Sequence, residues 1–460
     1  MTRQFGRGFR RLLRSSVLAV VMTGSALPAL AESLGDTLVA AYRHSALLDQ
    51  NRALLRAADE DVAGNMASLR PIVDWALQHS YNDRNGAEST TTTLGLTAEM
   101  LVYDFGRTQT AIDIAKETVL STRYALLGIE QDVLLRAVRA YMDVREATEQ
   151  VELQANSVRV LGQERQAAQD RFDVGEITVT DVALAEAQLA ASRASLSAAE
   201  GQLQVALEEY SAVTGGKPKG LNAPPPLPKR PASLEAAMAS AQKNHPAILQ
   251  ASREVAASEL RVVAAELQRN PRITGSAQLG VDIDGNTEAQ AGLSMTKRLY
   301  SGGRLSAAHR QAMASRDAAR AALLSSSRQI NQSVATAWAN IDVANAQIAA
   351  IKEQISAAQQ AYDGVREEAT LGARTTLDVL DAEQSLLEAR ADLISAEATL
   401  QLAHYQLLAA MGVLTVKDLK LGIPTYDPSA YYNAVSDAPY TSRQGENLDR
   451  VLERLKRGGN

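Results

Sequence analysis

The sequence contains an internal duplication, and this feature constrains the fold more than any single motif. Residues 171–215 align without a gap on residues 368–412, and 17 of the 45 positions are identical. The same offset of 197 residues aligns a second motif, Tyr-x-x-Gly-Arg, which begins at Tyr103 and again at Tyr300. One shared register across two separate motifs indicates a true repeat. Each half of the chain is therefore expected to fold in the same way.

The repeats are expected to occupy residues 32–213 and residues 234–412. Between them, residues 214–233 contain six prolines, and this composition predicts an extended connector. A final segment, residues 413–460, ends in a polar tail. Within that tail, the apolar residues of 448–455 have the spacing of a short amphipathic helix.

Residues 1–31 are interpreted as an export signal that is not part of the fold. Several arginines precede an apolar stretch, residues 17–30, that is short for a membrane span. Ala29-Leu30-Ala31 has the small-x-small pattern of a cleavage site, so we expect the mature chain to begin at Glu32, beyond the inner membrane. The alternative is an uncleaved membrane anchor.

Each repeat predicts the same order of helices and strands. A helix is followed by a β-hairpin, a very long helix and a second helix. The predicted ranges are 34–68, 71–103, 107–172 and 180–213 in the first repeat, and 234–268, 271–299, 304–370 and 377–410 in the second. At 1.5 Å per residue the very long helices span on the order of 100 Å. Such a length suits a rod or a tube and exceeds what a globular core requires.

The last helix of each repeat has a seven-residue pattern that predicts coiled-coil packing. Large apolar residues recur every seven positions, and three residues after most of them comes Ala or Ser. The large residues are Val182, Leu189, Leu196, Leu203 and Tyr210, then Val379, Leu386, Leu393, Leu400 and Leu407. A large residue alternating with a small one lets two helix axes approach closely. A plain periplasmic coiled coil has the same pattern, so this feature alone leaves that alternative open.

The two predicted β-hairpins favour a membrane protein over a plain coiled coil. Apolar and polar residues alternate through 73–81 and 94–102, and again through 273–282 and 289–296. Strands of about ten residues with one apolar face are typical of outer-membrane barrels. Four strands are too few to close around a lumen, and open sheet edges are not tolerated in lipid. The chain is therefore expected to oligomerise, and two, three or four subunits would supply 8, 12 or 16 strands.

Composition and motifs exclude several classes of function. The net charge of −6 makes nucleic acid an improbable partner. The chain has no cysteine, and its five histidines lie far apart. No phosphate-binding loop, nucleophile elbow or metal-ligating motif occurs, so no cofactor, metal or catalytic activity is expected.

The layout resembles the TolC family of outer-membrane efflux and secretion channels over essentially the whole mature chain. The most specific motif is the run Leu371-Gly372-Ala373-Arg374-Thr375-Thr376-Leu377-Asp378-Val379-Leu380-Asp381-Ala382. Its partner in the first repeat begins at Val174. The resemblance implies a mainly α-helical subunit in which long antiparallel helices form an α-barrel. It also implies a homotrimer whose twelve strands form a β-barrel in the outer membrane. Connector and final segment would form an equatorial belt.

The acidic residues after the second motif are candidates for a gate. Asp181 and Asp378 each follow a threonine by three residues, which is the spacing of a capping box. Asp381 replaces Leu184 of the first repeat, so capping does not account for it. In a trimer, Asp378 and Asp381 would form two stacked carboxylate rings that attract cations. Crowding of these charges is expected to raise some of their pKa values. Solvated surface acids are the alternative.

Arg374 is a second asymmetric position, because Ile177 is its counterpart in the first repeat. By resemblance, Arg374 would latch the closed tip to the neighbouring helical hairpin at Thr180 and Asp181, and opening would swing the second hairpin outward. One departure concerns this latch, since Ala369 stands where the best-studied member of the family has a tyrosine.

The sequence therefore predicts a passive exit duct of a tripartite efflux or type I secretion system. By resemblance, its partners would be a periplasmic adaptor and an inner-membrane transporter. The alternative function is a periplasmic coiled-coil structural or adaptor protein without a barrel. The sequence does not specify the cargo.

Overall fold

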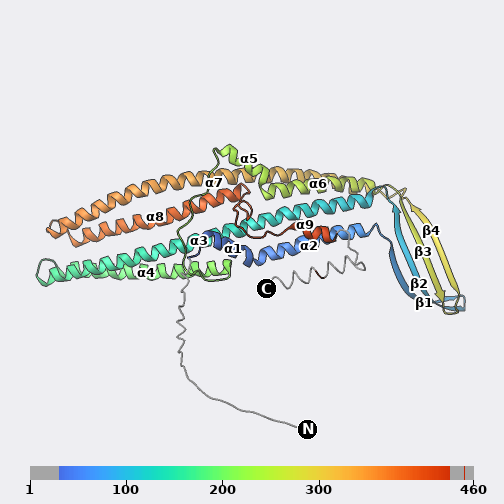
Figure 1. The fold of residues 1–460 in the computed structure, drawn as a ribbon, viewed down its shortest axis with the longest axis horizontal. Coiled ribbons are helices and arrows are strands. Elements are labelled where there is room, and N and C mark those ends of the chain that lie inside the picture. The colour runs from blue at the N-terminus through green and yellow to red at the C-terminus, as the bar shows by residue number, and fades with distance from the viewer. Residues whose placement is uncertain (1–30, 436–449, 451–460) are drawn as a thin grey trace, which may run out of the picture.

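The computed structural model describes residues 31–435 and residue 450. The predicted export signal and the predicted helix at 448–455 lie outside these residues, apart from Ala31 and Arg450. The molecule is elongated. A sheet lies at one end, the two turns that connect paired long helices lie at the other, and the long helices run between them (Figure 1).

Both repeats contain two short helices, a β-hairpin and two long helices, in the same order. The first repeat comprises α1 (Leu34–His44), α2 (Ala46–Ala67), β1 (Ile72–Arg84), β2 (Ala87–Tyr103), α3 (Arg107–Asp173) and α4 (Val179–Thr214). The second comprises α5 (Leu234–Asn244), α6 (Pro246–Leu267), β3 (Arg272–Asp282), β4 (Thr287–Thr296), α7 (Arg304–Thr370) and α8 (Thr376–Ala410), and α9 (Pro428–Val435) follows. The predicted mainly helical, duplicated fold is confirmed.

The prediction of one continuous helix at the start of each repeat was wrong. The chain breaks between α1 and α2 at Ser45 and between α5 and α6 at His245, and both residues have extended backbone angles. Each break residue caps the next helix: Leu48 N–H donates to Ser45 Oγ, and Ala247 N–H donates to His245 Nδ1. Pro246 is a further cause, because a proline disfavours the helical conformation of the residue before it.

The four described strands form one antiparallel sheet in the order β1-β2-β3-β4. Asn85 and Gly86, both with positive φ, form a tight turn between β1 and β2. Both strands therefore extend beyond the alternating runs 73–81 and 94–102, because an Asn-Gly pair favours a two-residue turn that lets both strands continue. The second hairpin turns through residues 283–286.

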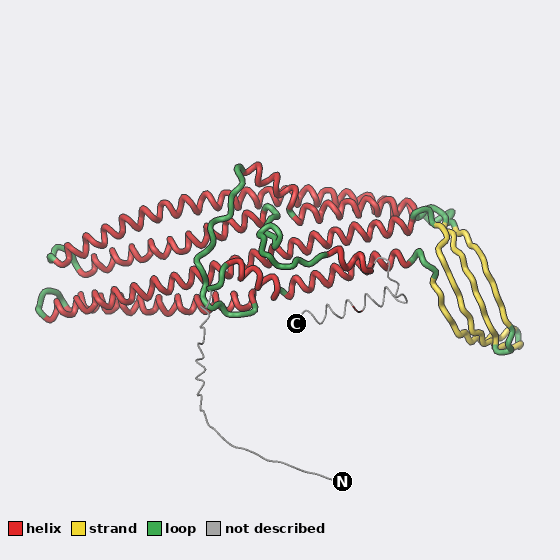
Figure 2. The backbone as a smooth tube through the Cα atoms, in the orientation of Figure 1, coloured by secondary structure: helices red, strands yellow, loops and turns green. Residues whose placement is uncertain are grey.

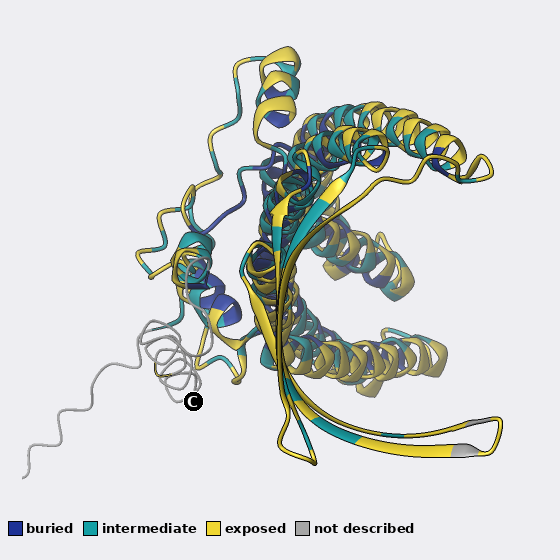
Figure 3. Cartoon of the chain, turned by 90° about the vertical axis from the view of Figure 1, so that its right-hand side faces the viewer, coloured by how far each residue is buried: buried dark blue, intermediate teal, exposed yellow. Residues whose placement is uncertain are grey.

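One face of the sheet is apolar and uncovered. Trp75 on β1 is 72% exposed, and Leu293 on β4 is 76% exposed. These residues alternate with polar ones, as expected for strands with two different environments. The sheet curves along an arc (Figure 3), and it lies beyond the ends of the helices between residues 31 and 435 (Figure 1). An apolar surface of this kind marks a site of contact with lipid or with another protein.

The long helices pack as two antiparallel hairpins, α3 with α4 and α7 with α8 (Figure 2). The predicted seams are observed: the small residues Ala185, Ser192, Ala389 and Ala396 are buried between the helices. The main core lies midway along the molecule, where α1, α3, α4 and the segment after Met411 meet around Tyr141, Tyr210 and Leu414. Between residues 31 and 435, no helix is both long enough and apolar enough to cross a membrane.

Candidate functional site

The two helix turns at the end opposite the sheet form the candidate site, which we call the tip (residues 171–190 and 366–390; Figure 2, green loops far from the strands). Gly175 and Gly372 have left-handed backbone angles and terminate α3 and α7. The N–H of the residue after each glycine donates to a carbonyl of the preceding helix, at Arg171 and at Glu368. A Schellman turn of this kind explains why both repeats have glycine here.

Capping boxes then start α4 and α8, as the spacing predicts. The Asp181 carboxylate accepts from the backbone N–H of Thr178 at 2.9 Å and from its hydroxyl at 2.7 Å. The Asp378 carboxylate accepts from the same two groups of Thr375, at 2.9 and 2.8 Å. The two tips therefore have the same backbone construction, and each is held by one aspartate.

These hydrogen bonds keep both aspartates ionised. Bonds from the Thr178 hydroxyl and backbone lower the pKa of Asp181. The pKa of Asp378 is likewise lowered by its bonds from the Thr375 backbone and hydroxyl, and further by the nearby Arg374. Within one chain, capping hydrogen bonds to the charged form set the pKa of Asp378, and the rise expected from crowding of the acids in a trimer stays a prediction.

Asp381 lies one turn further along α8 and is exposed. Within residues 31–435, its carboxylate makes no hydrogen bond, although its carbonyl accepts from Ser385 Oγ at 2.9 Å. Its neighbour Leu380 is only 5% exposed and packs against Leu161 of α3 and Leu189 of α4. Leu380 thus joins the second hairpin to the first, whereas the next residue, Asp381, takes no part in this buried contact.

Arg374 binds within its own hairpin in the single chain. Its Nε donates to the Glu368 carboxylate at 2.8 Å, and this bond raises the pKa of Arg374. The structure does not bring Arg374 together with Thr180 or Asp181, because Asp181 is bonded to Thr178 and Thr180 faces solvent. The latch at these two residues stays a prediction.

Ala369, which stands in place of the tyrosine of the best-studied family member, occupies a buried position. It lies at the end of α7 in an apolar cluster with Tyr362, Val379 and Leu386. A small side chain here lets α7 and α8 approach closely at the turn. Ala369 therefore serves the packing of the second hairpin and has no polar group to offer a latch.

A buried carboxylate at the contact between the hairpins was missed by the sequence reasoning. Glu383 on α8 is 7% exposed, and its Oε2 has no hydrogen-bond partner. It lines a polar cavity of about 340 Å³ between α3, α7 and α8. Across this contact Arg366 on α7 binds Glu164 on α3 at 3.3 Å.

Burial and the like charge of Glu164 raise the pKa of Glu383 to about 7, and Arg366 opposes this rise. The counterpart of Glu383 in the first repeat is Glu186, an exposed residue that binds Arg165 at 3.0 Å. Both positions are glutamate in the alignment of the repeats, so the alignment contains no sign of this difference. Glu383 is buried because the second hairpin packs against the first, and that contact cannot be derived from the sequence of one repeat.

Comparison with known proteins identifies the family. The model of the family described as "Outer membrane efflux protein" matches residues 38–216 and 237–413, one match for each repeat. The chain belongs to the outer membrane efflux protein family. The resemblance found in the sequence, the predicted place in the outer membrane and the predicted role as an export channel are thereby confirmed.

Individual relatives extend over nearly the whole chain. Outer membrane efflux protein BepC of Brucella suis biovar 1 (strain 1330) is 36% identical over 443 residues, covering 93% of this chain and 96% of the relative. Outer membrane protein TolC of Escherichia coli (strain K12) is 26% identical, covering 91% of this chain and 90% of the relative. The crystal structure of CusC has a TM-score of 0.76 at 18% identity, covering 83% of this chain and 92% of CusC, and supports the fold.

Proposed function

We propose that the chain is one subunit of a homotrimeric exit duct that spans the outer membrane and the periplasm. It would work with a periplasmic adaptor and an inner-membrane transporter in a tripartite efflux or type I secretion system. The duct itself is passive and has no catalytic role, so the transporter supplies the energy. Family membership supports this proposal, and the two hairpin tips supply the end that would face the partners.

The observation that carries the trimer is the open sheet. Of the described strands, β1 and β4 each have a neighbour on one side, and large apolar side chains cover one face. A sheet of four strands cannot close, and its free edge groups cannot remain unpaired in lipid. Pairing of β4 with β1 of the next copy removes both edges, and three copies would give a barrel of twelve strands.

The gate is proposed at the tip of the second hairpin. Asp378 and Asp381 of three copies would form two acidic rings around the axis. Asp378 is ionised through its capping bonds, and Asp381 carries a charge that no described side chain neutralises. Arg374, bound to Glu368 in one chain, would exchange this partner for Thr180 and Asp181 when the tip closes.

Extraction from membranes tests this function. A channel subunit is expected to require detergent and to migrate on a gel as an oligomer that heating dissociates. Its reconstitution into planar bilayers is expected to produce discrete conductance steps. Recovery in the soluble fraction released by osmotic shock, without conductance, would instead support the periplasmic coiled-coil alternative.

A further inference from the structure

A contact between the two repeats contains a charged clamp close to the sheet. Arg107 is the first residue of α3, and its Nη2 donates to three carbonyl oxygens at the end of α6. These are the oxygens of Leu267 at 3.3 Å, Gln268 at 3.4 Å and Asn270 at 2.9 Å. The last carbonyls of a helix have no partner within the helix and carry partial negative charge, so a guanidinium is a favourable cap.

The second repeat has the same arginine without this contact. Arg304 begins α7 as Arg107 begins α3, and the preceding glycines, Gly106 and Gly303, both have a φ of 86°. The side chain of Arg304 is exposed and forms no hydrogen bond or ion pair within residues 31–435. Arg304 is therefore placed at the start of α7 as Arg107 is at the start of α3. In the described part of the chain, however, its guanidinium caps no helix end.

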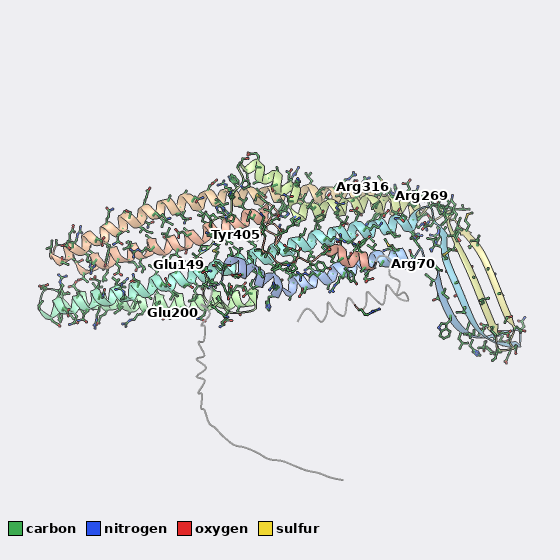
Figure 4. All side chains as sticks on the ribbon, in the orientation of Figure 1. Arg70, Glu149, Glu200, Arg269, Arg316 and Tyr405 are labelled. Atoms are coloured by element: carbon green, nitrogen blue, oxygen red, sulfur yellow. The ribbon has the colours of Figure 1, made fainter. Side chains whose placement is uncertain are left out.

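The end of α2 corresponds to the end of α6, and among the described residues no side chain donates to the carbonyls of Ala67, Ser68 or Arg70. At the end of α2, Leu69 N–H donates to Met66 O at 3.1 Å and Arg70 N–H to Ala67 O at 2.9 Å. The matching bonds after α6 are 3.1 and 3.0 Å. Figure 4 places Arg70 and Arg269 at these two ends, where α2 and α6 approach the sheet. The carbonyls of Ala67, Ser68 and Arg70 thus repeat the three that Arg107 binds.

The strand registers give the same equivalence independently. In the first hairpin Ile72 pairs with Glu99, and in the second Arg272 pairs with Thr296. β3 therefore repeats β1 with Arg272 in the place of Ile72, and β4 repeats β2 with Thr296 in the place of Glu99. Between the repeats, Ala98 of β2 pairs with Ala277 of β3. Met295 of β4 is the counterpart of Ala98, and Leu77 of β1 is the counterpart of Ala277. A join that repeats this pairing would therefore place Met295 opposite Leu77.

This register satisfies a second condition. Leu77 and Met295 both belong to the exposed apolar set of the sheet, so their pairing keeps the apolar face continuous across the join. A slip by one residue would turn all side chains of one strand to the opposite face. The join is between different copies, since four strands cannot close on themselves.

We infer that Arg304 is a clamp between subunits. Where β4 pairs with β1 of the next copy, as the proposed oligomer requires, Arg304 caps the end of α2 of that copy as Arg107 caps the end of α6, and Met295 lies opposite Leu77. This inference rests on the proposed oligomer and specifies its interface residue by residue.

Cysteine cross-linking tests the register, because the natural chain has no cysteine. Paired residues on adjacent antiparallel strands lie within reach of a disulfide. The double variant Leu77→Cys/Met295→Cys is expected to oxidise to a covalent oligomer. Ala98→Cys/Ala277→Cys, its counterpart within one chain, is expected to form a disulfide without linking subunits. Leu77→Cys/Leu293→Cys, out of register by two residues, is expected to link poorly.

A methionine substitution tests the clamp. Arg304→Met is expected to speed dissociation of the detergent-extracted oligomer at least about tenfold, since a hydrogen bond to a charged group is lost at every subunit join. Arg310→Met, further along α7 at another exposed arginine, is the control and is expected to dissociate at the natural rate.

Each outcome decides the inference. Preferential linking of Leu77→Cys/Leu293→Cys, or equal dissociation of Arg304→Met and Arg310→Met, would overturn it while the natural protein still extracted as a conducting oligomer. A natural protein that extracts as a monomer would overturn the proposed function as well.

Discussion

The tips of the two helical hairpins have the same backbone and differ in the side chains that surround it. Both hairpins turn through a left-handed glycine and begin their second helix with a threonine-aspartate capping box. The hairpin construction was therefore preserved in both copies of the repeat.

The differences lie just after the caps. Ala183 and Leu184 of the first repeat are exposed, whereas their counterparts are the buried Leu380 and the exposed acid Asp381. Glu186 is exposed and paired, whereas its counterpart Glu383 is buried at the contact between the hairpins. The second hairpin thus has residues that join it to the first, together with an acid that the first hairpin lacks. On this asymmetry we base the proposal that the second hairpin is the one that moves in a gate.

Replacing Leu380 by alanine is expected to have the largest effect on the contact between the hairpins. Alanine is the residue at the corresponding position of the first hairpin, Ala183. Leu380→Ala leaves a cavity against Leu161 and Leu189 and costs about 2–5 kcal/mol of packing between the hairpins. Hydrogen exchange of the α8 amides near the tip should rise accordingly. Leu184→Ala is the control, since that leucine is 37% exposed, and equal exchange in both variants would argue against the contact.

The raised pKa of Glu383 predicts that the stability of the contact between the hairpins depends on pH. Its pKa is about 7 when packed and returns towards the ordinary value of about 4.3 when the hairpins separate. A raised acid pKa favours the packed state at low pH, and this stability is lost progressively as the pH rises from about 4.3 to about 7, with an upper limit on the order of 3 kcal/mol. Channel open probability in bilayers should therefore increase from pH 5 to pH 8.

Two glutamine variants separate Glu383 from other titrating groups. Glu383→Gln is neutral at every pH and should keep the low open probability of the acidic condition throughout. Glu186→Gln changes the same residue type in the first repeat and should retain the natural pH response. An unchanged response in Glu383→Gln would assign the titration to another group.

Arg374→Ser is expected to have a smaller effect, because Arg374 and Glu368 are exposed and exposed ion pairs contribute little stability. Conductance should rise if Arg374 closes the tip. Ile177→Ser alters the counterpart in the first repeat and should leave conductance unchanged. Equal conductance in all three proteins would remove Arg374 from the latch.

The repeat structure could be predicted from the sequence because it depends on local signals. The bounds of α7 agree with the prediction, since Gly303 and Gly372 mark its two ends. The breaks at Ser45 and His245 were missed although Pro246 gave a signal for one of them. The helical spacing of apolar residues continues on both sides of each break, so one residue with extended backbone angles does not interrupt the pattern.

The tip could be predicted only in part. The capping roles of Asp181 and Asp378 follow from spacing within one turn of helix, and both were correct. The burial of Glu383 depends on how α8 lies against α3, and these two helices belong to different repeats of the chain. The bond of Arg374 to Glu368 crosses the turn between α7 and α8 and depends on the geometry of that turn.

The reversal potential of single channels under a salt gradient tests the central claim most directly. If the second hairpin carries the constriction, the natural channel prefers cations, and Asp378→Asn/Asp381→Asn shifts the potential towards zero. Asp381→Asn alone should produce part of the shift without disturbing a helix cap. The same reversal potential in the natural protein and in the double variant would contradict a gate lined by these acids.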